Sequence, residues 1–165
     1  MVNFAKDTRS AENSITIYCG VKGRCGLFYT MTGSDFESED IGRIFSWDAV
    51  SEVHRVRHGI YQRSGRLISL LTDFGKINPC YPDFHGDTQS VIHYTGNGRR
   101  GDQRLDAFNR ALLDAAGTEL SVPLFNKHAP GKWEFMGWWR VVDGAYVFDE
   151  SQSRMVWKFT LRKSE

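Results

Sequence analysis

The 165-residue sequence lacks the features that mark membrane and secreted proteins. No apolar run approaches the roughly 20 residues that a membrane-spanning helix needs, and the N-terminus has no apolar signal-peptide core. The formal net charge is only +1, so an anionic partner has to be met by local clusters of Lys and Arg. We therefore expect a soluble cytoplasmic protein with no membrane partner.

The chain is also poor in metal-binding and redox patterns. Its three cysteines cannot all pair, and their intervals match no zinc motif, so reduced thiols are expected. The five histidines are scattered and form no ligand spacing with a cysteine or carboxylate. We expect no metal and no cofactor.

Familiar catalytic motifs are missing as well. There is no Walker loop, no His-Glu-x-x-His and no Gly-x-Ser-x-Gly. Residues 96–101 fit Gly-x-Gly-x-x-Gly literally, but Arg99 and Arg100 fill the variable positions and no βαβ pattern follows. The sequence therefore predicts a binding protein and not an enzyme.

The hydrophobic content of 41% is enough for one compact domain. Residues 1–14 are polar and mixed in charge, and residues 1–40 form an N-terminal extension of unclear role, in which strands are expected at 14–18 and 26–31. We expect the main domain to span 41–165. Period-two alternation and short apolar runs predict its strands at 41–45, 67–71, 90–94, 120–125, 133–142, 146–148 and 155–161.

One main helix is expected at about 102–116, with Asp102 as its N-cap and Gly117 as its end. The fold class is therefore α+β, with a curved or closed and mostly antiparallel sheet. Residues 48–53 fit either one helical turn or a loop.

Two segments concentrate positive charge. The glycine turn at 96–101 carries Arg99 and Arg100, which suits a phosphate, although an ordinary loop with solvated arginines fits equally well. Residues 53–61 interleave cations with apolar side chains, which favours either a polyanion contact or a solvated edge strand.

Three segments, in this order, resemble the SET- and RING-associated (SRA) domain, which reads modified cytosine in DNA. The first is Val53-His54-Arg55 followed by Gly59-Ile60. The second is Tyr94-Thr95-Gly96-Asn97-Gly98 with Asp102-Gln103-x-Leu105 and Asn109-Arg110-Ala111-Leu112. The third is the tail, Gly137-Trp138-Trp139-Arg140-Val141-Val142 with Val156-Trp157-Lys158-Phe159-x-Leu161. The resemblance covers about residues 41–163 and implies an SRA or PUA-like barrel.

The resemblance implies a base-flipping reader of double-stranded DNA carrying 5-methylcytosine or 5-hydroxymethylcytosine. Tyr81 and Tyr94 would enclose the base, and Asp83 would accept a hydrogen bond from its exocyclic amine. Thr95 and Gly96 would meet the remaining polar edge, with Asn97 near the 5-substituent. Residues expected at the DNA backbone and the gap in the duplex are His54, Arg55, Arg57, His58, Arg99, Arg100 and Arg104. The alternative for Tyr81 and Asp83 is a simple Pro-Asp turn.

Asn109 is expected to bond the loop backbone instead of DNA.

The sequence also departs from the family pattern. Only Arg99-Arg100-Gly101 stands where eukaryotic members carry a long insert that reads the opposite strand, so little discrimination of hemimodified sites is expected. Val56 stands where the family has a proline, and Asn97 stands where it has a smaller residue. Asp83 lies one residue closer to Tyr81 than the family pattern leads us to expect. The compact pattern resembles prokaryotic readers found with HNH nucleases in modification-dependent restriction enzymes, which implies a nucleoid-associated protein with a fused or partner nuclease. A nuclease with an unrecognised site and a protein-interaction adaptor remain the alternatives.

Overall fold

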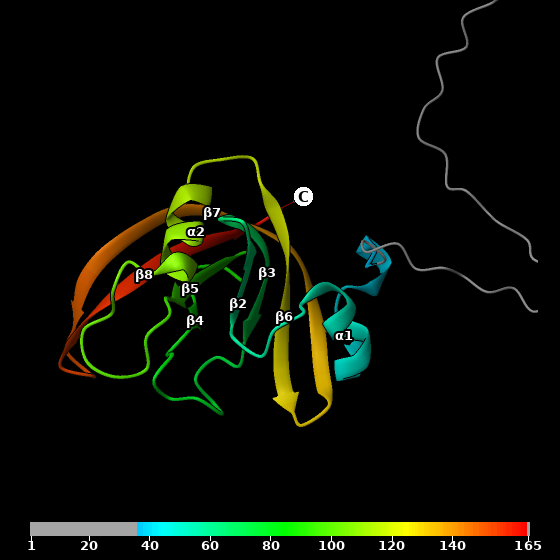
Figure 1. Cartoon of the computed structure of the whole chain (residues 1–165). Helices are drawn as coiled ribbons and strands as arrows, with labels where there is room; N and C mark the ends of the chain where they lie inside the picture. The colour runs from blue at the N-terminus through cyan, green and yellow to red at the C-terminus, as the bar shows by residue number, and fades with distance from the viewer. Residues whose placement is uncertain (1–35, 165) are drawn as a thin grey trace, which may run out of the picture. The chain divides into compact units, whose positions relative to one another are not determined.

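The computed structural model describes residues 36–164 (Figure 1). The strands expected at 14–18 and 26–31 lie outside the described residues, as does nearly all of the expected 1–40 extension. The elements are the 3-10 helix η1 Ser38–Asp40, β1 Ile44–Phe45, α1 Trp47–Val53, β2 Ile60–Arg63, β3 Arg66–Thr72, β4 Phe84–His85, β5 Val91–Thr95, α2 Ala107–Ala115, β6 Ser121–Ala129, β7 Lys132–Asp149 and β8 Arg154–Lys163.

The strands form one sheet in the order β2-β3-β6-β7-β8-β5-β4, with β1 paired to β7. All pairs are antiparallel except β3 with β6. The α+β prediction with a curved or closed, mostly antiparallel sheet is confirmed, and the sheet is not closed. Figure 1 shows β7 arching across the molecule with β8 alongside.

Strand β7 joins two predicted strands into one. Its first ten residues alternate between exposed or half-buried and buried positions, which is the period-two pattern of a sheet with one face on the core. The expected break near residue 143 is instead a register shift against β8, between Val141 and Asp143. The residue after this shift is Gly144. A Cβ at this position would lie 2.7 Å from the ring of Phe159, so a larger residue would clash with it. The glycine therefore permits close packing and does not end the strand.

The main helix, α2, begins later than the sequence suggested. Its N-cap is Asp106, whose carboxylate accepts hydrogen bonds from the backbone of Phe108 at 3.0 Å and Asn109 at 2.9 Å. The predicted cap, Asp102, instead accepts from the N–H of Met155 at 2.8 Å and anchors the preceding loop to β8. Tertiary bonding of residues 102–103 thus delays the helix, whereas the predicted end near Gly117, with φ of +73°, is confirmed.

A second helix, α1, decides the ambiguous stretch at 48–53 in favour of a helical conformation. Ser46 caps it through its hydroxyl, which accepts from the N–H of Ala49 at 3.4 Å. The described residues therefore contain two α-helices where one main helix was expected. Neither helix is long and apolar enough to span a membrane.

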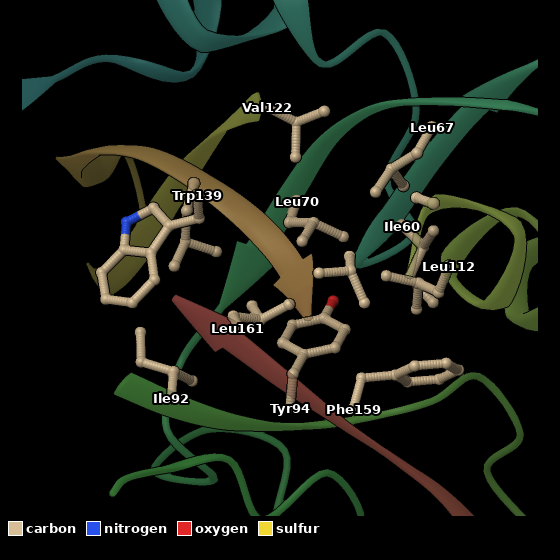
Figure 2. Close-up of a cluster of buried hydrophobic side chains, with 13 residues drawn as sticks. Ile60, Leu67, Leu70, Ile92, Tyr94, Leu112, Val122, Trp139, Phe159 and Leu161 are labelled. Atoms are coloured by element: carbon tan, nitrogen blue, oxygen red, sulfur yellow. The ribbon is translucent and has the colours of Figure 1, made fainter. Parts of the chain in front are cut away.

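Two apolar clusters stabilise the fold. The larger one packs α2 onto the concave sheet, and Figure 2 shows the ring of Tyr94 among its aliphatic and aromatic side chains. The smaller one gathers under α1 and includes Phe36, Leu71 and Trp133. Phe36 precedes the expected boundary at residue 41, although the division into a 1–40 extension and a 41–165 domain stays a prediction.

Candidate functional site

Strands β3 and β5 are not neighbours in the sheet, yet side chains join them across an opening that we call the seam. The hydroxyl of Tyr94, on β5, donates to the carbonyl of Leu71, on β3, at 2.9 Å, and shares its proton with the carbonyl of Gly59 at 3.0 Å. The carboxylate of Asp83 accepts from the Thr72 hydroxyl at 2.7 Å and from the Thr95 N–H at 2.7 Å. Two side chains therefore connect β3 and β5, which do not pair with each other through their backbones.

A cavity of about 510 Å³ opens at the seam. It brings together all six residues predicted for the base pocket, which are Tyr81, Asp83, Tyr94, Thr95, Gly96 and Asn97. Its mouth is cationic, with Arg57 and Arg99 among the lining residues. The cavity thus combines aromatic walls, two buried acids, Asp73 and Asp83, and a positive rim.

Asp83 is the chemically distinctive group in the cavity. Burial raises the pKa of this carboxyl to about 7, against the hydrogen bonds from Thr72 and Thr95 and the charge of Lys158, which lower it. Each carboxylate oxygen has room for more than one hydrogen bond. The ionised group can therefore accept a further donor from a ligand.

The two tyrosines hold different positions. Tyr94 is 3% exposed, and burial raises the pKa of its phenol well above the usual value, so it stays protonated. Tyr81 is half-buried, and its carbonyl accepts from the N–H of Asp83 at 2.9 Å. The tight turn considered as an alternative is therefore present, and it carries both side chains into the cavity lining.

Arg154 positions the loops around the cavity, a role that the sequence did not reveal. Its guanidinium is 7% exposed and donates to the carbonyls of Gly98 at 2.7 Å, Gly101 at 3.1 Å and Cys80 at 2.9 Å. It thereby links the loop that carries Tyr81 to the glycine turn. An arginine at the start of a strand carries no sequence signal of this role, because its partners are backbone atoms of distant segments.

The sequence also did not reveal the role of Thr72, whose hydroxyl donates to Asp83 in the cavity, although this residue directly follows the predicted strand at 67–71.

The glycine turn is fixed from behind. A Cβ on Gly96 would lie 2.5 Å from Oδ1 of Asn109, so only glycine fits there. Asn109 accepts from the N–H of Asn97 at 2.7 Å and donates to the carbonyl of Asn97 at 2.9 Å, which confirms its predicted bonding to the loop backbone. The Asn97 side chain donates to Asp106 at 2.7 Å and is therefore tied to the start of α2.

The N–H groups of Thr95 and Gly96 are already engaged inside the protein. The first donates to Asp83, and the second donates to the carbonyl of Trp157 at 2.8 Å. A ligand edge that needs a backbone donor would therefore have to find it elsewhere in the cavity.

The predicted cationic contacts divide into two groups. Arg57, His58 and Arg99 line the cavity. Three others are exposed but lie outside its lining, namely Arg55, Arg100 and Arg104. Each exposed cation is positioned for solvent or a polyanion, and its contact with DNA stays a prediction.

His54 contradicts its predicted role, because its side chain is 0% exposed. Nδ1 lies 2.8 Å from the hydroxyl of Ser69, and Nε2 lies 2.6 Å from the carbonyl of His58. Burial lowers the pKa of His54 to about 4, so the imidazole is neutral. It shapes the loop ahead of β2 from within and cannot reach DNA.

Comparisons with known proteins agree with this geometry. Residues 48–164 match the family model described as ScoMcrA-like, SRA domain. No curated protein matches the chain.

Three solved structures share the fold at low identity. The SUVH5 SRA complex with methylated CHH DNA has a TM-score of 0.60 at 22% identity, covering 76% of this chain and 88% of that one. The SUVH5 SRA structure bound to fully hydroxymethylated CG DNA has a TM-score of 0.60 at 20% identity, covering 81% and 92%. The modification-dependent TagI restriction endonuclease has a TM-score of 0.60 at 21% identity, covering 75% of this chain and 49% of that one. The match thus spans about half of TagI.

Proposed function

The chain belongs to the ScoMcrA-like SRA domain family, and from this premise we propose that it binds double-stranded DNA containing modified cytosine, with the base flipped into the seam cavity. The observation that carries the proposal is the position of Asp83, a buried carboxylate with spare acceptor capacity between aromatic walls. The SRA structures with methylated and hydroxymethylated DNA support the ligand class.

The energetics of flipping favour a cavity of this composition. Extruding a base costs a few kcal/mol of lost stacking and pairing. Each base–aromatic contact returns about 1–3 kcal/mol, and Tyr81 and Tyr94 both line the cavity. The cost of extrusion is therefore met within the pocket.

Asp83 would provide the choice between bases. Cytosine presents an exocyclic amine, a donor that the ionised carboxylate accepts. Thymine and uracil present a carbonyl oxygen at the same position, which a carboxylate repels. The cavity therefore selects cytosine, with Asn97 and its neighbours facing the 5-substituent, which would be methyl or hydroxymethyl.

The exposed arginines would hold the distorted backbone. Arg57 and Arg99 lie at the cavity mouth and Arg100 lies just beyond it. Because only Arg99, Arg100 and Gly101 separate the glycine turn from Asp102, the loop offers little to read the opposite strand. We therefore expect hemimodified and fully modified sites to bind about equally well.

The biological setting we propose is the reader of a modification-dependent restriction system. The TagI match supports it, and about half of that endonuclease lies outside the match. Cleavage would then reside in a fused or partner HNH nuclease, and this chain would act by binding alone. Residues 1–40 would form an extension that precedes the 41–165 reader domain in the sequence.

The deciding experiment is a titration of otherwise identical duplexes that carry cytosine, 5-methylcytosine or 5-hydroxymethylcytosine at one site. A 2-aminopurine next to the target reports extrusion through its fluorescence. We expect tighter binding and a fluorescence rise only with modified duplexes. Equal affinities for all three duplexes would refute the proposal, and cutting in the presence of Mg²⁺ or Mn²⁺ would favour the nuclease alternative.

The pocket assignment is tested separately with Asp83→Ala. Loss of the acceptor should lower the preference for modified over unmodified DNA by about 1–3 kcal/mol. The matched control is Asp143→Ala, which removes an exposed carboxylate from β7 and should leave the preference unchanged. Arg100→Ala should weaken every duplex alike. An unchanged preference in Asp83→Ala would move the pocket elsewhere.

A further inference from the structure

A second cavity of about 320 Å³ adjoins the seam cavity. The two share four lining residues, Arg57, Leu71, Lys127 and Trp133. The second cavity adds Trp47 and the turn between β6 and β7, and no carboxylate lines it. Among the described residues, its charged lining side chains are therefore Arg57 and Lys127, both positive.

The two cations are held in place by tryptophan rings. The guanidinium of Arg57 lies 5.3 Å from the ring centre of Trp47, and the ammonium of Lys127 lies 5.4 Å from that of Trp133. The two rings pack 5.4 Å apart, and Trp133 belongs to the smaller apolar cluster. The aromatic pair thus preorganises two positive charges beside the base pocket, which reduces the entropy lost on binding.

Within residues 36–164, neither cation has an ion pair or a side-chain hydrogen bond. Other cations nearby are engaged, since Lys158 donates to the Thr95 hydroxyl at 2.9 Å and Arg154 to backbone carbonyls. The two acids that line the seam cavity are engaged elsewhere, since Asp73 accepts from Gly75 and Asn78 in its own turn and Asp83 accepts from Thr72 and Thr95. The N–H donors of Arg57 and Lys127 are therefore available to an external anion.

We propose that the second cavity binds a DNA phosphate, held jointly by Arg57 and Lys127, next to the extruded nucleotide. This inference rests on the proposed function. A nucleotide whose base enters the seam cavity leaves its phosphates at the mouth, because the strand must return to the duplex. The shared wall places the second cavity within reach of such a phosphate, and the absence of any lining carboxylate suits an anion. Base stacking is disfavoured there because cations already cover the tryptophan faces.

The phosphate site predicts the behaviour of Lys127→Gln. This variant keeps a long polar side chain on β6 and removes the charge. We expect its affinity for a methylated duplex to fall on the order of tenfold, and the salt dependence of binding to weaken by about one phosphate contact. The matched control is Lys132→Gln, on the same hairpin but exposed and outside both cavities, which should bind like the wild type.

A neutral phosphate locates the contact. In methylated duplexes, single methylphosphonate linkages replace each phosphate flanking the modified cytosine in turn. We expect one position to weaken the wild type but to cause no further loss in Lys127→Gln, since the contact is already gone. Arg57→Gln should show the same loss of sensitivity at the same position.

The possible outcomes distinguish failure of the phosphate site from failure of the proposed function. If Lys127→Gln binds as tightly as the wild type, or if every neutral linkage weakens both proteins equally, the phosphate site is wrong. A retained preference for methylated DNA would then leave the proposed function standing. If the wild type shows no such preference, the proposed function fails, and the phosphate site next to an extruded base fails with it.

Discussion

The β7–β8 ladder and the seam hold the same sheet together by different means. Between β7 and β8 the backbone pairs from Trp139–Lys163 to Asp149–Arg154, interrupted by one register shift. Between β3 and β5 the main joints are the side chains of Tyr94 and Asp83. Backbone groups do not titrate in the physiological range, whereas a buried carboxyl does. The connection between β3 and β5 therefore contains a titratable group, whereas the β7–β8 ladder does not depend on one, and the cavity lies at that connection.

The largest expected effect would test the ladder. Leu161, on β8, is 0% exposed in the larger apolar cluster. Leu161→Ala should lower the free energy of unfolding by about 2–5 kcal/mol because it leaves a cavity in the core. Urea unfolding measures the loss, and the preference for modified DNA should persist where the variant is folded.

Its control is Thr160→Ala, on the neighbouring half-buried position, which should cost far less stability. Equal losses in the two variants would contradict the assignment of Leu161 to the core.

The next largest effect is the pH dependence of stability, which should arise from buried titratable side chains and not from the β7–β8 ladder. The folded pKa of Asp83, about 7, exceeds its ordinary 3.8, so its stabilising contribution is present below about pH 4 and is lost as the pH rises to about 7. The folded pKa of His54, about 4, lies below its ordinary 6.5, so its contribution is present above about pH 6.5 and is lost as the pH falls to about 4. Each contribution is on the order of a few kcal/mol, and the two oppose each other.

Substitutions separate the two contributions. Between about pH 4 and pH 7, Asp83→Asn should become more stable as the pH rises, because only His54 remains, and His54→Gln should become less stable. Urea unfolding across this range gives the slopes. Parallel slopes in both variants would show that neither group titrates as its burial indicates.

The smallest expected effect separates the two roles of Tyr94. Tyr94→Phe removes the hydroxyl that joins Leu71 and Gly59 but keeps the ring. We expect the free energy of unfolding to fall by about 1–2 kcal/mol because two hydrogen bonds are lost. The preference for the modified base should be retained because stacking needs only the ring. A lost preference at unchanged stability would instead assign the hydroxyl to DNA recognition.

Local patterns predicted most of the fold. Leu67 to Leu71 and Met155 to Leu161 are strands as expected, because apolar runs and period-two alternation reflect the burial of a sheet. The errors arose where distant bonds override local preference. Asp102 resembles an N-cap but bonds to β8, and Asp143-Gly144 resembles a turn but lies within β7.

The candidate site was likewise predicted in part from the sequence. The six residues predicted for the base pocket from the family resemblance all line the cavity, whereas Thr72, Lys127 and Trp133 line it without having been predicted. His54 was misplaced because a histidine between cations looks exposed, whereas its partners Ser69 and His58 satisfy it inside the fold. Arg154 was missed because its role depends on carbonyls that only folding brings near.

The sequence by itself determined where most of the longer strands lie, where the glycine turn lies and which acid and aromatic side chains are available. It did so because these properties depend on neighbours along the chain. Only the tertiary structure decided that β3 and β5 do not pair with each other, that Asp83 and Tyr94 connect them, and that two cations on tryptophan rings lie beside the cavity. Those features depend on strand order and curvature, which bring together groups far apart in sequence, and burial then changes their charge.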